Sequence, residues 1–189
     1  MILRDEAAAC EETCRFRDAG GSVLVEFSTY DFGPDWSVLQ RISQNTGVHI
    51  LGGIGFYRSE GLESVLSRYS DSEWVEKMVD EWAHGEAKTG AKPSFLKWST
   101  SLDRITPAEH RSAAIVAEVA RRTGLPVVTH TQRGTMVTEQ LKLLRELGVD
   151  LSRLLISHID MRTELSAESF QEVLDVGANV SIDQLGKPK

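Results

Sequence analysis

Residues 106–130 read TPAEHRSAAIVAEVARRTGLPVVTH, and this stretch indicates the fold of the whole chain. It begins with a capping-box pattern, Thr106 and Glu109, with proline at the first helical position. The predicted helix ends at Gly124, a residue type that commonly closes helices in a left-handed conformation. The apolar run PVVTH follows at once and ends in His130. A helix followed directly by a buried strand is the repeating unit of a parallel α/β sheet.

The same alternation continues in both directions along the chain. Short runs that are apolar and mostly uncharged are typical of strands buried on both faces. Six such runs occur, at 23–27, 48–54, 94–98, 126–130, 154–158 and 179–183. Amphipathic helical patterns separate them. The long connection 57–93 contains one helical pattern, over 73–82, and is interpreted as a loop insertion.

The pattern therefore predicts an α/β fold with six parallel strands and intervening helices. A closed (β/α)8 barrel has eight strands and usually about 250 residues, whereas this chain has 189 residues. Two architectures remain open: a doubly wound open sheet, or part of a TIM-type barrel. Because no linker, low-complexity tract or repeat divides the sequence, residues 1–189 are predicted to form a single domain.

Composition excludes several classes of protein. The chain is 41% hydrophobic and 26% charged, with 21 basic and 28 acidic residues and a net charge of −7. An acidic chain without a Lys/Arg cluster does not predict a nucleic-acid partner. No apolar run approaches the roughly 18 residues of a membrane span, and the start lacks a secretory pattern. Two cysteines, Cys10 and Cys14, without a disulfide framework favour a reducing compartment, so a cytoplasmic location is expected.

Histidine placement is the most informative chemical feature. His130 and His158 each end a predicted strand, at the edge of a parallel sheet that binds ligands. Imidazoles on consecutive strands would converge within metal-chelating reach. Lys97 is expected at a similar height one strand earlier, where a buried cation is costly unless it is paired, neutralised or modified. Each residue alone has an ordinary structural explanation, but the three together favour a site.

Acidic residues near strand ends could orient an imidazole through its second nitrogen. The candidates are Glu26, Asp160 and Asp183. A solvated loop carboxylate is the favoured interpretation for Glu26 and Asp160, and both interpretations remain open for Asp183. The sequence has neither the G-x-S-x-G elbow of serine hydrolases nor a phosphate-binding glycine loop.

Several phrases occur together in one order along the chain. They are Gly20-Gly21, ISQNTGVHI at 42–50, GFY at 55–57, RITPAE at 104–109, TGLPVVTHT at 123–131 and ISHID at 156–160. Together they resemble the phosphotriesterase family of the amidohydrolase superfamily, from about residue 20 to residue 187. The TGLPVVTHT phrase and the following strand ending in histidine are the most specific parts of the resemblance.

The resemblance implies a (β/α)8 barrel that binds two divalent metal ions, usually zinc. Lys97 matches the catalytic lysine that carbon dioxide converts to N6-carboxylysine, which bridges the two metals. His130 and His158 match the histidines that bind the more exposed metal. Tyr57 falls where the family places an aromatic residue against the substrate.

The sequence also departs from the family pattern in two places. The family's His-x-His on strand one and its aspartate on strand eight, which hold the other metal, have no counterpart here. The six runs then correspond to barrel strands two to seven, and residues 1–189 to an incomplete hydrolase domain. The alternative to a fragment is that the ligands of the second metal were lost during evolution.

The resemblance implies hydrolysis of a phosphotriester, lactone or related ester through a hydroxide that bridges the metals. The expected partner is a small-molecule ester, and the full-length protein is expected to be a homodimer. This chain alone is expected to be inactive. Two other functions remain open: a Schiff-base lyase that uses Lys97 as an amine nucleophile, and a non-catalytic, metal-binding remnant.

Overall fold

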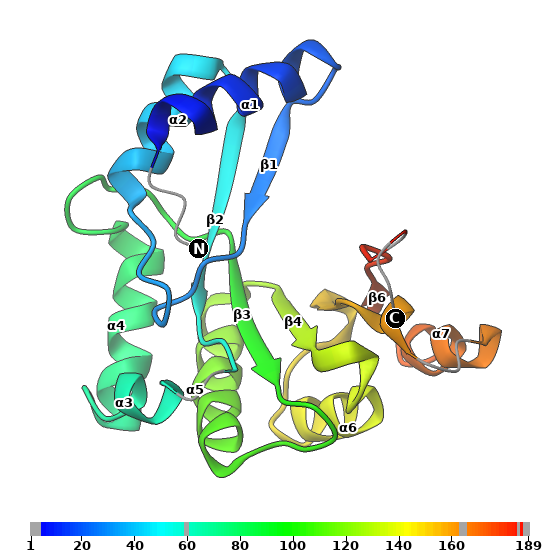
Figure 1. Cartoon of the computed structure of the whole chain (residues 1–189). Helices are drawn as coiled ribbons and strands as arrows, with labels where there is room; N and C mark the ends of the chain where they lie inside the picture. The colour runs from blue at the N-terminus through cyan, green and yellow to red at the C-terminus, as the bar shows by residue number, and fades with distance from the viewer. Residues whose placement is uncertain (1–4, 59–60, 163–165, 185, 187–189) are drawn as a thin grey trace.

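The computed structural model describes residues 5–58, 61–162, 166–184 and 186. Six parallel strands form one sheet in the order in which they occur along the chain (Figure 1). They are β1 (Val23–Glu26), β2 (His49–Gly55), β3 (Phe95–Thr100), β4 (Val127–Thr131), β5 (Leu154–Ile156) and β6 (Asn179–Val180). A doubly wound sheet reverses its strand order at a switch point, whereas this one does not. The sheet is therefore a partial barrel, which confirms the predicted fold class.

Helices follow the strands as the sequence predicts. They are α1 (Glu6–Asp18), α2 (Trp36–Thr46), α3 (Leu62–Leu66), α4 (Asp71–His84), α5 (Pro107–Thr123), α6 (Val137–Glu146) and α7 (Ala167–Leu174). The capping box at Thr106 and the left-handed end at Gly124 (φ 71°) are both present. Within the described part of the chain, no helix is long and apolar enough to span a membrane.

The connection 57–93 is more than a loop insertion. It contains α3 and α4, and α4 covers the predicted helical pattern at 73–82. Trp74 and Met78 of α4 are buried in the same hydrophobic core as α5. The segment therefore belongs to the helical layer of the barrel, and the interpretation as an insertion was wrong.

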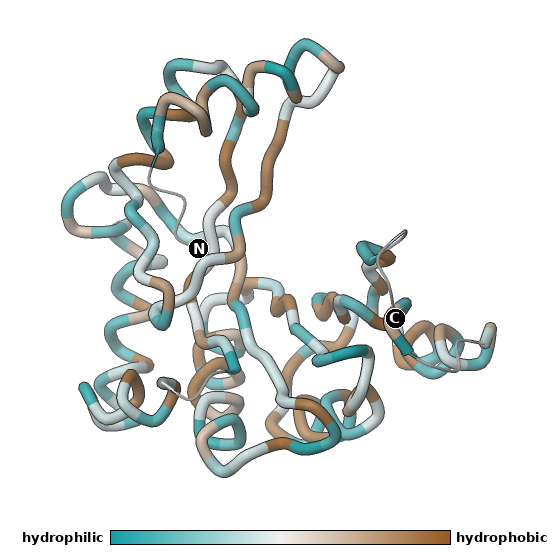
Figure 2. Tube along the Cα trace, viewed as in Figure 1, coloured by the Kyte–Doolittle hydropathy of each residue, from teal (hydrophilic) through white to brown (hydrophobic). Residues whose placement is uncertain are grey.

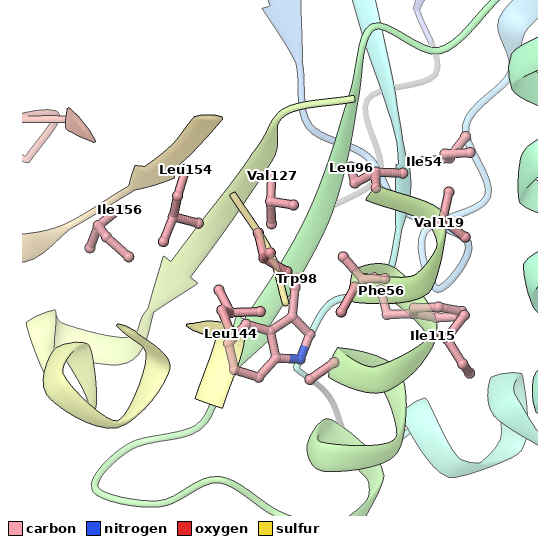
Figure 3. Close-up of a cluster of buried hydrophobic side chains, with 14 of the residues drawn as sticks. Ile54, Phe56, Leu96, Trp98, Ile115, Val119, Val127, Leu144, Leu154 and Ile156 are labelled. Carbon is pink, nitrogen blue, oxygen red and sulfur yellow. The ribbon is translucent and has the colours of Figure 1, made fainter. Parts of the chain in front are cut away.

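The core lies between one face of the sheet and the helices. Leu96 and Trp98 of β3 meet Ile115 and Val119 of α5 there (Figure 3). The indole nitrogen of Trp98 donates a hydrogen bond of 2.9 Å to the carbonyl of Glu109, so its polar atom is satisfied inside the core.

The opposite face of β1 and β2 is apolar but uncovered by the described residues. Val23, Val25 and Leu51 are 44%, 45% and 39% exposed. Brown stretches mark these two strands in Figure 2. Because side chains alternate along a strand, this face is the one that would line the interior of a barrel.

The register corrects the predicted height of Lys97. β3 continues to Thr100, so Lys97 lies inside the strand, opposite Val128, and Ser99 is the residue opposite His130. Lys97 is therefore two residues deeper than His130, although strand alternation keeps both on the same face. The extra residues are polar but buried, and Thr100 accepts a hydrogen bond from Gln140.

Gly55 brings β2 unusually close to β3. Its φ is 141°, and a Cβ placed there would lie 2.1 Å from the backbone oxygen of Lys97. The next residue, Phe56, donates a backbone hydrogen bond of 2.9 Å to the same oxygen. Only glycine permits this approach, which fixes the backbone that carries Lys97.

The last two strands are shorter than predicted. β5 ends at Ile156, and β6 pairs with it at only two positions. His158 follows β5 in a left-handed conformation (φ 65°), and Asp183 lies beyond β6. Both residues are therefore on turns rather than on the strands themselves.

Candidate active site

A pocket of about 680 Å³ lies at the carboxyl ends of the strands. Its walls come from β1, β3 and β4 and from the turns that follow β1, β2, β4, β5 and β6. The lining residues are Glu26, Phe27, Ser28, Phe32, Tyr57, Lys97, His130, Thr131, Gln132, Arg133, Ser157, His158, Met161, Asp183 and Gln184. The structure thus brings together all four residues that the sequence proposes: Tyr57, Lys97, His130 and His158.

The two histidines face each other across the pocket floor. Their ring centroids are 4.6 Å apart, and the rings meet edge to face at 77°. Nε2 of His130 lies 3.0 Å from Oε1 of Gln132 and 3.4 Å from the hydroxyl of Tyr57. Because an amide oxygen only accepts, Nε2 donates to it, and Nδ1 of His130 is left as the acceptor nitrogen.

His158 is oriented from the other side. Its Nδ1 lies 2.6 Å from Oδ1 of Asp183, so Nε2 is the nitrogen left free to accept. The side-chain amide of Gln184 donates to the same carboxylate oxygen at 3.1 Å. Burial works to raise the pKa of Asp183, but the hydrogen bonds from His158 and Gln184 hold it below its usual value. Asp183 therefore has the orienting position that the sequence left open.

Lys97 is 5% exposed and lies beneath the histidines. Its Nζ donates to the carbonyl of Thr129 at 3.0 Å and lies 4.8 Å from the centre of the Phe27 ring. Burial lowers the pKa of Lys97 to about 8, while the Asp183 carboxylate acts to raise it. The amine is therefore far easier to deprotonate than a surface lysine.

His130 shows the same effect more strongly. Burial lowers its pKa to about 4, with smaller contributions from the neighbouring His158 and Lys97. The hydrogen bond to Gln132 opposes this shift. The imidazole is therefore neutral at pH 7, which is the form that binds metals.

Two acidic residues differ from their predicted roles as solvated loop carboxylates. Glu26 lines the pocket, and its Oε1 accepts from the backbone and the hydroxyl of Ser28 at 3.0 and 2.6 Å. Its Oε2 is buried and has no partner among the described residues. Asp160 is also buried and accepts from the backbone nitrogen of Gln184 at 2.8 Å. Both carboxylates are structural parts of the pocket or of its support.

Sequence reasoning also missed Gln132 and Gln184. Both are amides close to a site residue along the chain, since Gln132 is two positions after His130 and Gln184 directly follows Asp183. That proximity is the signal that could have indicated them, because residues following a strand end share its loop. Glutamine is nevertheless common on loops, so the residue type alone carries little information.

Two imidazole nitrogens are available as donors to a metal ion. Nδ1 of His130 and Nε2 of His158 have no hydrogen-bond partner within the described ranges, and the two rings are close. No group of three or more His, Cys, Asp or Glu side chains among the described residues could hold a metal. Lys97 would offer oxygen donors to a metal only after carboxylation, because its amine has none. Ligands for a second metal are not present in the part of the chain that the structure describes.

Comparison with known proteins extends these observations. The model of the phosphotriesterase family matches residues 3–189. The phosphotriesterase homology protein of Escherichia coli is 30% identical over 98% of this chain and 63% of its own length. Human N-acetyltaurine hydrolase is 29% identical over 98% of this chain and 53% of its own length.

Solved structures agree with the sequence matches. The E. coli phosphotriesterase homology protein, complexed with phosphate in its active site, superposes with a TM-score of 0.87. A lactonase from Listeria monocytogenes, 26% identical, also gives 0.87, over 98% of this chain and 61% of that one. An organophosphorus hydrolase from Deinococcus radiodurans gives 0.85 at 33% identity, over 97% and 58%. The chain thus spans between about half and two thirds of the length of these proteins.

Proposed function

Because the chain belongs to the phosphotriesterase family, we propose that its pocket serves the metal-dependent hydrolysis of a small phosphotriester, lactone or related ester. One observation carries the proposal. Two imidazoles, 4.6 Å apart between ring centroids, have free acceptor nitrogens above a buried lysine. The named relatives are hydrolases of a lactone, of organophosphorus compounds and of N-acetyltaurine.

Lys97 would act as a ligand after carboxylation. The neutral amine attacks carbon dioxide, a nitrogen–carbon bond forms, and the proton leaves to water, which gives a carbamate anion. A pKa of about 8 leaves a substantial neutral fraction near pH 7.5. The product exchanges a costly buried cation for an anion with two oxygen donors.

His130 and His158 would hold the metal, and zinc is a divalent ion that commonly binds imidazole and carboxylate-type ligands. Such an ion supplies Lewis acidity toward a carbonyl or phosphoryl oxygen and lowers the pKa of water. Gln132 and Asp183 fix the two rings through their other nitrogens. Phe27 covers Nζ of Lys97 and limits its contact with water.

Tyr57 would form a wall against the substrate. Its ring meets the His130 ring at 68° with centroids 4.9 Å apart, and its hydroxyl points toward Nε2. An aromatic side chain in this position limits the width of the pocket above the metal ligands and contributes binding energy.

Zinc binding by the 189-residue chain tests the proposal. We expect His130→Ala and His158→Ala to lose zinc measured after gel filtration, while His84→Ala retains it. His84 is an exposed histidine on α4 that pairs with Asp80, so it is a matched control. Any turnover of lactones, aryl esters or phosphotriesters should be confined to protein that contains zinc. Equal zinc content in all variants would contradict the proposal.

A second function follows from the same lysine. A desolvated amine with a pKa of about 8 is also a good nucleophile for a carbonyl carbon, as in Schiff-base lyases. Borohydride would trap such an adduct on Lys97 and raise the protein mass by the bound fragment. Trapping that persists in chelator would favour the lyase over the metal-dependent hydrolase. A chain with neither trapping nor zinc would be a non-catalytic remnant.

A further inference from the structure

The turn after β4 and the turn after β5 lie against each other beside the pocket. The first turn, Gln132–Gly134, carries the amide that contacts Nε2 of His130. The second turn, Ile159–Met161, begins directly after His158. The position of each imidazole therefore depends on the turn next to it.

Gly134 is a point where the two turns touch. A Cβ placed there would lie 2.9 Å from the backbone nitrogen of Arg162 and 3.1 Å from the carbonyl oxygen of His158. Its φ of 70° is also in the left-handed region that favours glycine. The absence of a side chain at this position therefore lets the backbone of His158 come into contact with the turn after β4.

Arg162 holds the same contact from the other side. Its Nε donates a hydrogen bond of 3.0 Å to the carbonyl of Gly134. Its backbone nitrogen donates to the carbonyl of Ile159 at 3.2 Å, which closes the turn after β5. Its Nη2 lies 3.9 Å from Oε2 of Glu172 on α7. One residue thus joins the turn after β4, the turn after β5 and a helix of the outer layer.

Both turns include a residue with a Cβ in a left-handed backbone conformation. The φ angle is 52° at Arg133 and 65° at His158. Such conformations are costly for residues other than glycine, so they persist where neighbouring contacts maintain them. The contact between Gly134 and Arg162 crosses between the two turns and can therefore maintain both.

From these contacts we propose that Gly134 and Arg162 are positioning residues, which hold the imidazoles of His130 and His158 at the spacing that lets both bind one metal ion. This rests on the proposed function, because the two imidazoles are its metal ligands. Functional groups of a metal site must be held within about 0.5 Å of their productive geometry. A slip of one turn against the other would therefore weaken metal binding while the sheet stays folded.

Two substitutions of Arg162 isolate the hydrogen bond to Gly134. Glutamine carries its side-chain nitrogen on Cδ, as arginine carries Nε, so Arg162→Gln keeps a donor there, whereas Arg162→Met has none. Both variants lose the ion pair with Glu172. Zinc affinity of the full chain, measured against a chelating dye, should fall about 3- to 10-fold in Arg162→Met and stay within about twofold of the parent in Arg162→Gln. Arg145→Met is the control, because Arg145 is exposed on α6 and does not line the pocket.

A substitution of Gly134 tests the contact independently. Gly134→Ala should lower zinc affinity at least about tenfold, because the added methyl group would push the backbone of His158 away. Gly124→Ala is the matched control, since Gly124 has a nearly identical φ of 71° but nothing within 4 Å of its Cβ position. It should leave zinc affinity unchanged. Urea midpoints show whether each variant folds, and if Gly134→Ala does not, the two Arg162 variants decide.

A measurement without metal separates this proposal from the hydrolase itself. In EDTA, NMR of the parent chain should show nuclear Overhauser contacts between the rings of His130 and His158, whose centroids are 4.6 Å apart. Arg162→Met and Gly134→Ala should weaken these contacts, and Arg162→Gln should keep them. That result in a chain that binds no zinc would contradict the hydrolase and support the positioning role.

Two outcomes would overturn the positioning role. One is unchanged zinc affinity and unchanged ring contacts in folded Arg162→Met and Gly134→Ala. The other is an equal loss in Arg162→Gln and Arg162→Met, because the hydrogen bond to Gly134 would then have no effect of its own.

Discussion

Oδ1 of Asp183 lies 2.6 Å from Nδ1 of His158, although the two residues are 25 positions apart in the chain. The contact joins the turn after β5 to the turn after β6. It fixes both the orientation of the ring and the nitrogen that faces the pocket. In metal sites such a carboxylate increases the basicity of the ligating imidazole.

Asp183→Asn should therefore weaken zinc binding by about 10- to 100-fold, because the ring loses its charged partner. Competition against a chelating dye would measure the change. Asp175→Asn is the control, since Asp175 is an exposed residue after α7 that accepts from Gln171. Zinc affinity equal to that of the parent chain would show that the contact is structural only.

Lys97→Ala should abolish zinc retention, and millimolar acetate or propionate should partly restore it by occupying the place of the carbamate. Lys97→Arg should fail in both conditions, because a guanidinium stays protonated and cannot be carboxylated. Carbon-13 NMR of the parent chain in labelled bicarbonate should show a carbamate signal that Lys97→Ala lacks. Unchanged zinc content in Lys97→Ala would rule out the lysine as a ligand.

Tyr57→Ala should weaken the binding of a lactone or aryl ester, measured by calorimetry, or raise KM in any zinc-containing protein that shows turnover, while leaving zinc content unchanged. The reason is that a pocket wall contributes binding rather than ligation. Tyr69→Ala serves as the comparison, since Tyr69 is an exposed tyrosine outside the pocket. Loss of zinc from Tyr57→Ala would instead place the tyrosine in the support of His130.

The low pKa of His130 predicts a loss of stability in mild acid. The unfolded imidazole, with a pKa near 6.5, takes up a proton that the folded one, with a pKa of about 4, does not bind. The free energy of unfolding should therefore fall as the pH drops from 6.5 to 4, by about 3 kcal/mol at most. Urea unfolding in EDTA at pH 7 and pH 4 would measure it. His130→Gln should lose correspondingly less over this range, and an identical loss would contradict the assignment.

Gly55→Ala should destabilise the chain by at least about 3 kcal/mol, because the added Cβ would overlap the backbone of β3. Gly124→Ala is the matched control. Gly124 also has a positive φ, of 71°, but nothing lies within 4 Å of its Cβ position, so the cost should be about 1 kcal/mol. Similar urea midpoints for the two variants would show that the strands can move apart.

The order of helices and strands could be predicted because its signals are local. The capping box at Thr106 and the glycine at position 124 act within one turn of helix. Strand ends were less predictable. Ser99 and Thr100 are polar residues of a kind that often marks a loop, yet both are buried in β3. The side chain of Gln140, 40 residues away, donates a hydrogen bond to the hydroxyl of Thr100, and no local pattern reveals that contact.

Some residues of the candidate site could likewise be predicted from the sequence, and others could not. His130 and His158 were predictable because the carboxyl ends of parallel strands, and the turns that directly follow them, meet at the ligand-binding edge. The contacts of Gln132 and Glu26 depend on turn conformations and on neighbouring strands. Glu26 was interpreted as solvated, yet it lines the pocket, and Ser28 of the turn after β1 donates to its carboxylate. Polar loop residues therefore need the structure before their role can be assigned.

The short pairing of β6 has a kinetic consequence for the pocket. Only two residues of β6 pair with β5, yet the segment that follows carries Asp183 and Gln184. Opening this pairing breaks few hydrogen bonds, so hydrogen exchange should be faster there than in β3 and β4. Each opening releases His158 from its carboxylate while the rest of the sheet stays folded. The residence time of a bound metal would then depend on this local opening, and metal exchange would be faster than global unfolding.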